Sequence, residues 1–323
     1  MTRFHRKSVP SYFHIFLVVL LGGAIIGICV MLLVLLGSAP PPGRINVIVA
    51  SDPVIVWSWN TQDNTFAVVT IPSDIVITGL HGYGEYSLAA LWKLGIIDKK
   101  NGSLLADSAK EALGVPALFY FGERHEDVQK QTDAIAYGER IFSFRTMPSF
   151  LSGRYLTNIP FSSFVALTRA LKGVRPDKIH QIDLTSNAIA IPQNLPDGSR
   201  QLTLDPAKSD RVLKNVFEDD QIRKDGLAVA VYNTTSTPTL GNRMARLLSN
   251  LGVLVLTVGN DTPPVSRCTV SGDKQALTSQ TAKTIEQFFH CLLLERHDER
   301  VDLVVRIGTD YANLFAPRSE KKE

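Results

Sequence analysis

A run of 22 uncharged residues, Ile15 to Leu36, constrains the fold of this chain more than any other feature of its sequence. At 1.5 Å per residue, a helix of this length spans about 33 Å, enough to cross a hydrocarbon core of about 30 Å. The apolar region of a cleaved signal peptide is shorter, at about 7–15 residues, and a core helix is rarely apolar on every face. The run is therefore predicted to be an uncleaved transmembrane helix, with a signal peptide and a buried helix as alternatives.

The flanks of this run predict its orientation. Residues 1–14 contain three basic side chains and no acidic one, whereas residues 37–43 carry no charge. Because cytoplasmic flanks carry the excess of Lys and Arg, we expect residues 1–14 to be a cytoplasmic tail. Residues 15–36 then span the cell membrane once, and everything after them is extracytoplasmic. Residues 37–43, which include three consecutive prolines, are expected to form a stiff stalk.

Composition excludes several classes of protein. The chain has 34 basic and 31 acidic residues, a net charge of +3. A nucleic-acid-binding protein would carry a strongly basic face, so no nucleic acid is expected as a partner. Three cysteines are too few for a disulfide-built miniprotein or a four-cysteine zinc module.

Residues 44–217 are predicted to form an α/β sandwich domain. Short β-branched runs indicate strands, and two of them flank a polar five-residue loop that suits a hairpin. Strands are expected at 45–50, 54–59, 65–71, 75–78, 115–121 and 178–184, and helices at 87–94, 103–113, 162–172 and 209–217. Residues 185–205 are either a hairpin or an irregular excursion. The alternation of strands and helices is typical of an α/β fold.

A second, smaller domain is predicted at residues 227–315, after a polar linker at residues 218–226. Strands are expected at 227–232, 253–258, 268–270 and 301–307, and helices at 240–251 and 277–294. The order β-α-β-β-α-β is that of a split βαβ sandwich. Residues 316–323 are expected to be a charged tail.

Cys268 and Cys291 are predicted to form a disulfide bond. Both are expected outside the membrane, where disulfides persist, while Cys29 lies in the apolar run. The predicted long helix packs back across the sheet and brings its end towards the strand of Cys268. The Cα atoms could then lie within the roughly 4.4–6.8 Å that a bridge needs. Two independent buried thiols are the alternative.

Asp52 and Asp74 are candidate ligands of a metal ion. Each stands at a strand end, on the same side of the predicted sheet. Mg²⁺ prefers carboxylate oxygens that are presented in this way. The alternative is that both are ordinary solvent-exposed aspartates at strand termini. No catalytic residue is assigned.

Five short motifs resemble a known family. They are Ile71-Pro72-Ser73-Asp74, Val231-Tyr232-Asn233, Leu251-Gly252-Val253, Val258-Gly259-Asn260 and Ile307-Gly308-Thr309-Asp310. Together they resemble the bacterial LytR–CpsA–Psr (LCP) family of membrane-anchored envelope proteins, with a LytR C-terminal domain appended. The resemblance implies an N-terminal domain that moves glycopolymers from polyprenyl pyrophosphate carriers to peptidoglycan. It also implies Mg²⁺, with arginines and aspartates that bind the pyrophosphate.

Ser73 departs from the family motif, Ile-Pro-Arg-Asp, which has an arginine at this position. Serine cannot make the charged, bidentate contact of arginine with phosphate, and the loss of one preorganised donor typically costs about 10²–10³ in rate. Asp74 matches the aspartate of the motif. Asp52 matches a second family aspartate whose neighbouring arginine is also missing. Ser73, Asp74 and Asp52 are therefore the candidate ligand-binding residues.

We therefore expect a degenerate, non-catalytic envelope protein that binds, scaffolds or regulates glycopolymer assembly. Its partners would be polyprenyl-pyrophosphate glycan, peptidoglycan or envelope proteins. One alternative is an active phosphoglycosyl-type transferase with rearranged arginines, for which Arg140, Arg145 and Arg154 lie in the right region. Another is a purely structural envelope protein. An open apolar tunnel beside Asp74 would favour lipid binding, whereas a core filled by side chains would contradict it.

Overall fold

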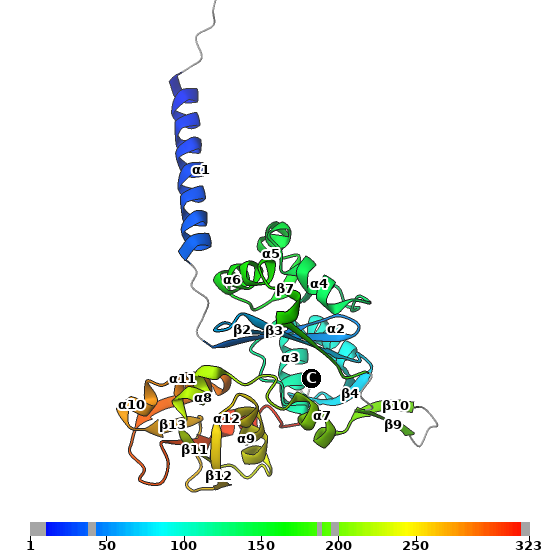
Figure 1. Cartoon of the computed structure of the whole chain (residues 1–323), viewed down its shortest axis with the longest axis vertical. Helices are drawn as coiled ribbons and strands as arrows, with labels where there is room; N and C mark the ends of the chain where they lie inside the picture. The colour runs from blue at the N-terminus through cyan, green and yellow to red at the C-terminus, as the bar shows by residue number, and fades with distance from the viewer. Residues whose placement is uncertain (1–10, 38–42, 186–188, 195–199, 318–323) are drawn as a thin grey trace, which may run out of the picture.

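The computed structural model describes residues 11–37, 43–185, 189–194 and 200–317. Helix α1 (Ser11–Gly37) projects from the folded body, and only its C-terminal end lies close to that body (Figure 1). Among the described residues, no helix is both long and apolar enough to cross a membrane. Parts of the predicted cytoplasmic tail (1–10), stalk (38–42) and charged tail (318–323) lie outside the described residues.

A six-stranded sheet forms the centre of the N-terminal domain, in the order β7-β6-β1-β2-β3-β8. The strands are β1 (Arg44–Val49), β2 (Val54–Asn60), β3 (Thr65–Ile71), β6 (Phe119–Glu123), β7 (Tyr155–Thr157) and β8 (Ile179–Asp183). The first three form an antiparallel meander, and β6 and β8 run parallel to its two outer strands. Val54 lies opposite Ile71 and Asn60 opposite Thr65, which confirms the hairpin predicted around the polar loop.

Both faces of this sheet are buried, because residues of each strand alternate between two hydrophobic layers. On β2, Trp57 and Trp59 face one layer, while Val54 and Val56 face the other. Two groups of helices cover the two faces of this sheet, and one of them lies above the sheet in Figure 1 while the other packs against the opposite core layer. The upper group is α4 (Ala134–Ile141), η1 (Phe144–Thr146), α5 (Met147–Leu151) and α6 (Phe161–Lys172), and the other group is α2 (Leu88–Ile97) and α3 (Ser103–Leu113). The predicted sandwich is thus a three-layer arrangement.

A four-stranded sheet, β5-β4-β10-β9, completes the N-terminal domain. Its strands are β4 (Ile75–Gly79), β5 (Gly84–Ser87), β9 (Ala190–Asn194) and β10 (Arg200–Leu204). Strands β9 and β10 pair antiparallel, so residues 185–205 contain the hairpin that was one of the two expectations. Helix α7 (Pro206–Leu213) follows and is capped by Asp205, but it ends four residues before the predicted end at residue 217.

Two further predicted boundaries in this domain are wrong. Helix α2 does not end before Gly95 but continues to Ile97. A Cβ atom at Gly95 would collide with the backbone of Asn101, so this glycine permits close packing rather than ending the helix. Strand β6 begins at Phe119 instead of residue 115, because a tight turn in which Ala117 N donates to the Val115 carbonyl precedes it.

The C-terminal domain contains a five-stranded sheet, in the order β12-β11-β15-β13-β14. Its strands are β11 (Ala228–Asn233), β12 (Leu254–Asn260), β13 (Thr269–Gly272), β14 (Leu292–Glu295) and β15 (Leu303–Ile307). Its helices are α9 (Leu240–Asn250), α10 (Lys274–Leu277), α11 (Gln280–Phe289) and α12 (Thr309–Ala312). The predicted helix 277–294 is wrong in its last turn. His290 adopts a left-handed conformation that ends α11, and strand β14 follows.

The predicted linker contains a short helix, α8 (Asp220–Asp225), which is capped by Asp219. The same segment is tied to the first strand of the N-terminal domain. Arg44 Nε donates to the Glu218 carbonyl at 2.9 Å, and Arg44 N donates to Asp219 Oδ2 at 3.0 Å. Residues 218–226 therefore join the two domains as a folded connection.

Polar contacts hold α3 against the C-terminal domain. Tyr311 Oη donates to Glu111 Oε1 at 2.8 Å, and both side chains are buried. Asn250 Nδ2 donates to the Gly114 carbonyl at 2.7 Å, and Arg246 pairs with Asp210 of α7. Burial raises the pKa of the Glu111 carboxyl above its ordinary value of 4.5, in opposition to the smaller effects of Lys110 and Tyr311. Burial also raises the pKa of Tyr311 well above its usual range.

The Glu111 carboxyl is expected to make stability depend on pH. A raised pKa in the folded state means that its stabilising contribution is complete below pH 4.5 and is lost as pH rises through the raised pKa. Glu111→Gln keeps an acceptor for Tyr311 but cannot ionise. As the pH rises above 4.5 and through the raised pKa of Glu111, the Tm of the native protein should fall relative to that of the variant. The exposed Glu286→Gln on α11 is the control, and parallel pH profiles for all three proteins would contradict this expectation.

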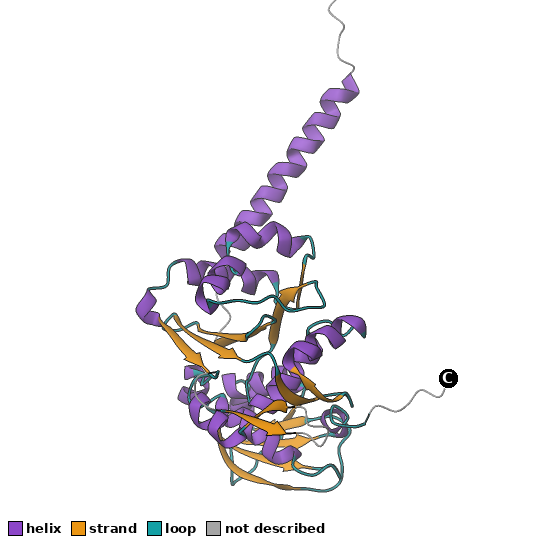
Figure 2. Cartoon of the chain, turned by 90° about the vertical axis from the view of Figure 1, so that its right-hand side faces the viewer, coloured by secondary structure: helices purple, strands orange, loops and turns teal. Residues whose placement is uncertain are grey.

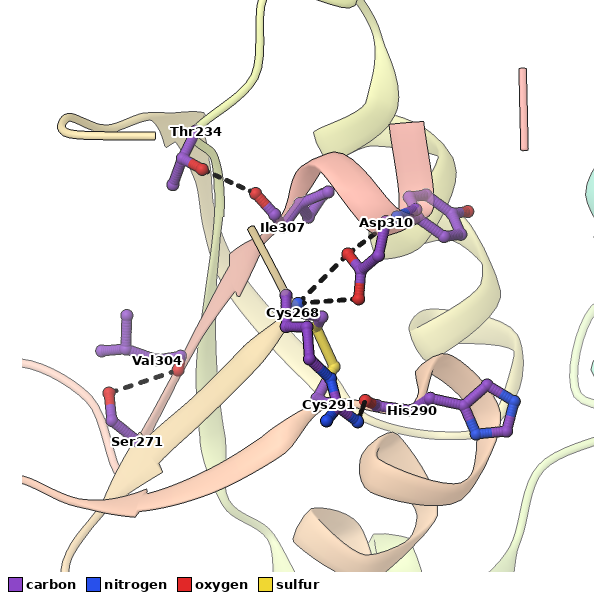
Figure 3. The surroundings of a disulfide bond; sticks show 10 residues. Thr234, Cys268, Ser271, His290, Cys291, Val304, Ile307 and Asp310 are labelled. Carbon is purple, nitrogen blue, oxygen red and sulfur yellow. Dashed lines mark hydrogen bonds between the residues drawn. A yellow bond between two sulfur atoms is a disulfide. The ribbon is translucent and has the colours of Figure 1, made fainter. Parts of the chain in front are cut away.

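The two cysteines of the C-terminal domain, Cys268 and Cys291, form a disulfide in the structure, with 4.3 Å between their Cα atoms (Figure 3). This is the predicted pair, but the geometry differs from the expected one. Cys291 does not lie on a helix. It directly precedes β14, which pairs in parallel with β13, and Leu292 N donates to the Cys268 carbonyl at 2.8 Å. The two residues are therefore neighbours at the ends of adjacent strands.

Removal of this disulfide should destabilise the C-terminal domain. The bond closes a loop with a sequence separation of 23 residues, for which the chain-entropy relation gives about 3 kcal/mol. Cys268→Ala/Cys291→Ala should lower the free energy of unfolding by about this amount in urea denaturation of the full chain. Cys29→Ser, which removes the free thiol of α1, is the control and should leave the curve unchanged. An unchanged free energy of unfolding in the double variant would show that the pairing of β13 with β14 stabilises this part of the domain without the disulfide.

Candidate functional site

The predicted site residues Asp52, Ser73 and Asp74 line one polar cleft of about 480 Å³. The cleft lies where β3 and β8 end and where the chain leaves β1 for β2. Its other lining residues come from these strand ends and from the segment around the start of α4. They are Pro53, Ile55, Thr70, Pro72, Gln131, Thr132, Ala134, Gln181, Asp183 and Thr185.

Ser73 and Asp52 form a bonded pair in the wall of this cleft. Ser73 Oγ donates to Asp52 Oδ1 at 2.6 Å, and Ser73 is buried. The backbone of Asp52 is fixed by the segment before α4, since Asp52 N donates to the Gln129 carbonyl at 2.9 Å and Gln131 N donates to the Asp52 carbonyl at 2.7 Å. The position that carries the arginine in the family motif is therefore occupied by a hydroxyl already engaged with a carboxylate.

Asp74 is the exposed acid of the cleft. It lies in a turn before β4, which is closed by Ile75 N donating to the Pro72 carbonyl at 3.3 Å. Among the described residues, no side chain forms a hydrogen bond or ion pair with its carboxylate. Asp74 is thus the lining carboxylate most accessible to a ligand.

Asp183 is a third acid of the cleft, which the sequence reasoning missed. Its Oδ1 accepts hydrogen bonds from Thr70 Oγ1 at 3.0 Å and from Thr185 Oγ1 at 2.6 Å. Strand β8 runs parallel to β3, with Asp183 opposite Thr70, so the two strands end together. The available signal was that Asp183 closes a predicted strand of an α/β fold, where carboxyl ends gather at one edge of the sheet.

The electrostatic character of the cleft is acidic. Three aspartates line it, and no Lys or Arg is among the described residues that do so. The candidate arginines are placed elsewhere. Arg140 approaches the rim, where its Nη2 donates to Gln131 Oε1 at 3.3 Å, while Arg145 lines another cavity. Arg154 follows α5, and its backbone N donates to the Ser149 carbonyl. A bare pyrophosphate would meet like charge in this cleft.

Side chains fill the layer between the sheet and helices α4 to α6. The ring of Trp57 lies 5.9 Å from that of Phe66 and 6.2 Å from that of Phe142, measured between centroids. Each of these rings is 2% exposed or less. A Cβ atom at Gly138 of α4 would collide with the Trp57 ring. This filled core around Trp57 contradicts the binding of a polyprenyl chain there.

The geometry defines a two-domain α/β protein with an acidic cleft in its first domain and a disulfide-bonded second domain. Residues 226–311, which make up most of that second domain, match the LytR_C family, described as the LytR cell envelope-related transcriptional attenuator. The chain therefore carries a LytR C-terminal domain over these residues, as the sequence motifs indicated. No curated protein matches the sequence of the chain.

Solved structures with partial likeness include members of the LCP family. The transcriptional regulator YvhJ from Bacillus subtilis has 14% identity and a TM-score of 0.39, over 54% of this chain and 94% of that chain. TagV from B. subtilis has 13% identity and a TM-score of 0.38, over 67% and 99%. The LytR-CPS2A-Psr family protein YwtF (TagT) with bound octaprenyl pyrophosphate lipid has 10% identity and a TM-score of 0.36, over 54% and 89%. Because these TM-scores lie below 0.5, the function of the N-terminal domain has to be argued from its own residues.

Loss of the Ser73 hydroxyl should destabilise the cleft. Ser73→Ala leaves a half-buried carboxylate without its donor, and a single hydrogen bond of this kind contributes about 1 kcal/mol. The free energy of unfolding should therefore fall by about this amount in urea denaturation. Ser152→Ala, at an exposed position, is the control. Equal stability of the two variants would mean that water replaces Ser73 as the partner of Asp52.

Proposed function

We propose that this chain is a membrane-anchored, extracytoplasmic envelope protein whose LCP-like N-terminal domain binds a glycopolymer component without transferring it. Its role would be scaffolding or regulation of envelope glycopolymer assembly. The LytR C-terminal domain supports a role in the cell envelope. The binding role is argued from the cleft around Asp52.

The pairing of Ser73 with Asp52 is the observation that carries this proposal. In an LCP transferase the corresponding arginine would face the pyrophosphate, whereas Ser73 is neutral and donates to a neighbouring acid at 2.6 Å. The absence of Lys and Arg from the described cleft lining removes the other means of neutralising a pyrophosphate. The aromatic rings around Trp57 fill the core between the sheet and α4, which leaves no room there for a polyprenyl chain. Each of these features disfavours glycopolymer transfer, and each is compatible with a stably folded domain.

A hydroxyl-rich ligand suits the cleft better than a bare pyrophosphate. Carboxylates accept hydrogen bonds, and sugar hydroxyls donate them. Asp74 is exposed, and Asp183 and Asp52 hold their oxygens in the same cleft. A glycan would thus be recognised through its hydroxyl groups.

We expect Mg²⁺ to bind in the cleft only together with a phosphate group of the ligand. Among the described residues, no group of three or more His, Cys, Asp or Glu side chains is arranged to hold a metal ion. Mg²⁺ does not require such a cage, since it commonly uses one or two carboxylates together with substrate phosphates. Asp52 and Asp74 are the residues that would hold it. The ion would supply the positive charge that the cleft lacks.

Membrane anchoring is proposed from the sequence of the first 43 residues. The uncharged run 15–36 is long enough for one span, and the basic residues precede it. The domains that follow would then lie outside the cell membrane, where the disulfide of the C-terminal domain would persist. Carbonate extraction of membranes should leave the full chain in the pellet. Protease added to intact spheroplasts should digest the folded domains, and complete protection would contradict the orientation.

An active transferase is the second candidate, because Arg140 reaches Gln131 at the rim of the cleft. The full chain in nanodiscs, given a polyprenyl-pyrophosphate glycan, peptidoglycan and Mg²⁺, separates the two. We expect saturable binding of the glycan without transfer to peptidoglycan. Transfer that is lost in Arg140→Ala would establish the enzyme. Neither binding nor transfer would leave a purely structural envelope protein.

Restoring the family arginine should raise affinity for pyrophosphate. Ser73→Arg adds a charged donor to a cleft that has none among its described lining residues. A charged hydrogen bond contributes about 1.5–3 kcal/mol, so the Kd for Mg²⁺-pyrophosphate should fall about tenfold or more in calorimetry. Ser152→Arg adds the same charge at an exposed, distant site and is the control.

Asp74→Ala should weaken binding of Mg²⁺-pyrophosphate in the Ser73→Arg background while leaving the Tm nearly unchanged. The reason is that Asp74 is exposed and, among the described residues, has no side-chain partner to lose. Calorimetry and thermal unfolding of the same samples measure both quantities. A lower Tm with unchanged binding would instead identify Asp74 as a turn residue.

A further inference from the structure

The helical layer beside α1 carries a second cavity, separate from the acidic cleft. The cavity has a volume of about 520 Å³ and lies between the end of α4, the turn η1 and the end of α6. Helix α1 contacts α6, and both views show its C-terminal end beside this layer (Figures 1 and 2). The lining residues are Glu139, Phe142, Ser143, Phe144, Arg145, Thr168, Leu171, Lys172 and Val174.

The cavity combines a buried floor with a charged rim. Phe142, Leu171 and Thr168 are buried, whereas Arg145 and Lys172 are exposed. Among the described residues, no carboxylate pairs with either cation. Lys172 Nζ lies 5.9 Å from the centroid of the Phe144 ring. The rim thus presents two basic side chains over an apolar interior, with Glu139 as its one acid among the described lining residues.

Thr168 supplies an independent sign that the cavity accepts a ligand. Its side chain is 1% exposed, and its hydroxyl has no hydrogen-bond partner among the described residues. A buried hydroxyl without a partner is costly. An ester or phosphate oxygen in the cavity would accept its hydrogen. The cavity therefore offers a polar contact at its floor as well as at its rim.

The surroundings of the cavity favour a bilayer as the source of that ligand. Phe144 is 41% exposed and Leu151 is 66% exposed on the same helical layer. Exposed apolar side chains among basic ones are typical of surfaces that lie in the headgroup region. Five residues separate Gly37 from Gly43, and a chain of that length reaches at most about 20 Å. The tether therefore keeps this layer near the end of α1.

We propose that this cavity binds the headgroup of an anionic phospholipid, so that α5 and α6 rest on the outer leaflet. This inference rests on the membrane anchoring proposed above. Arg145 and Lys172 bind the phosphate, Thr168 binds a lipid oxygen, and Phe144 and Leu151 enter the upper part of the bilayer. The acidic cleft lies near the other end of α4, where Ala134 lines it, and is separate from this headgroup site.

Quenching by brominated lipids tests this contact. The full chain, with Cys29→Ser and a fluorophore on Leu151→Cys, is placed in nanodiscs that contain brominated anionic or brominated zwitterionic phospholipid. We expect clear quenching with the anionic lipid and at most half as much with the zwitterionic one. Arg145→Glu/Lys172→Glu should remove the difference. The matched control Lys274→Glu/Lys283→Glu changes the charge equally on exposed residues of the C-terminal domain and should retain it.

Other outcomes would overturn the inference. Equal quenching by the two lipids would mean that no headgroup is recognised. Loss of quenching on addition of inorganic phosphate would identify a site for free phosphate instead. A fluorophore on Leu256→Cys, exposed on β12, should show no quenching, and equal quenching there would mean that no particular face meets the membrane. Carbonate extraction reports the anchor separately, since a chain that resists extraction without quenching keeps the anchor and refutes the headgroup site.

Discussion

The burial of both faces of the central sheet is the constraint on which the rest of the N-terminal domain depends. Residues of β1, β2 and β3 alternate between two apolar layers, and almost none of them reaches solvent. Helices must therefore cover both sides. Polar groups of the strands can meet water only where the strands end. The acidic cleft occupies one such end, and its acids come from the chain just beyond β1 and β3 and from the last residue of β8.

The same packing supports the proposal that this domain binds a glycopolymer component without transferring it. A lipid-linked transferase needs space for an apolar chain and cations for its pyrophosphate. Here aromatic rings around Trp57 occupy the apolar layer, where they contribute to stability directly. The Ser73 hydroxyl donates its hydrogen bond to the Asp52 carboxylate, so it is not available to donate to a ligand. The aromatic core and the acidic cleft are separate parts of the domain, which is compatible with the proposed binding role.

The C-terminal domain is held by two different kinds of restraint. Within the domain, the disulfide joins the ends of β13 and β14, which are already paired by backbone hydrogen bonds. Between the domains, the buried contact of Glu111 with Tyr311 and the pair of Arg246 with Asp210 fix α3 and α7 against it. Arg44 ties the connecting segment to β1. The N-terminal domain and the LytR C-terminal domain are therefore expected to move as one body.

The sequence by itself determined the features that depend on neighbours along the chain. The hairpin of β2 and β3 and the helix from Ser103 to Leu113 with its left-handed Gly114 follow from local periodicity and turn chemistry. The LytR C-terminal domain was indicated by the resemblance of its short motifs to that family. Only the tertiary structure decided that Asp183 joins Asp52, that β14 replaces a helical turn, and that aromatic rings close the layer above the sheet. Each of these depends on pairing between residues far apart in sequence. Local patterns do not encode which distant strand or ring will be the partner.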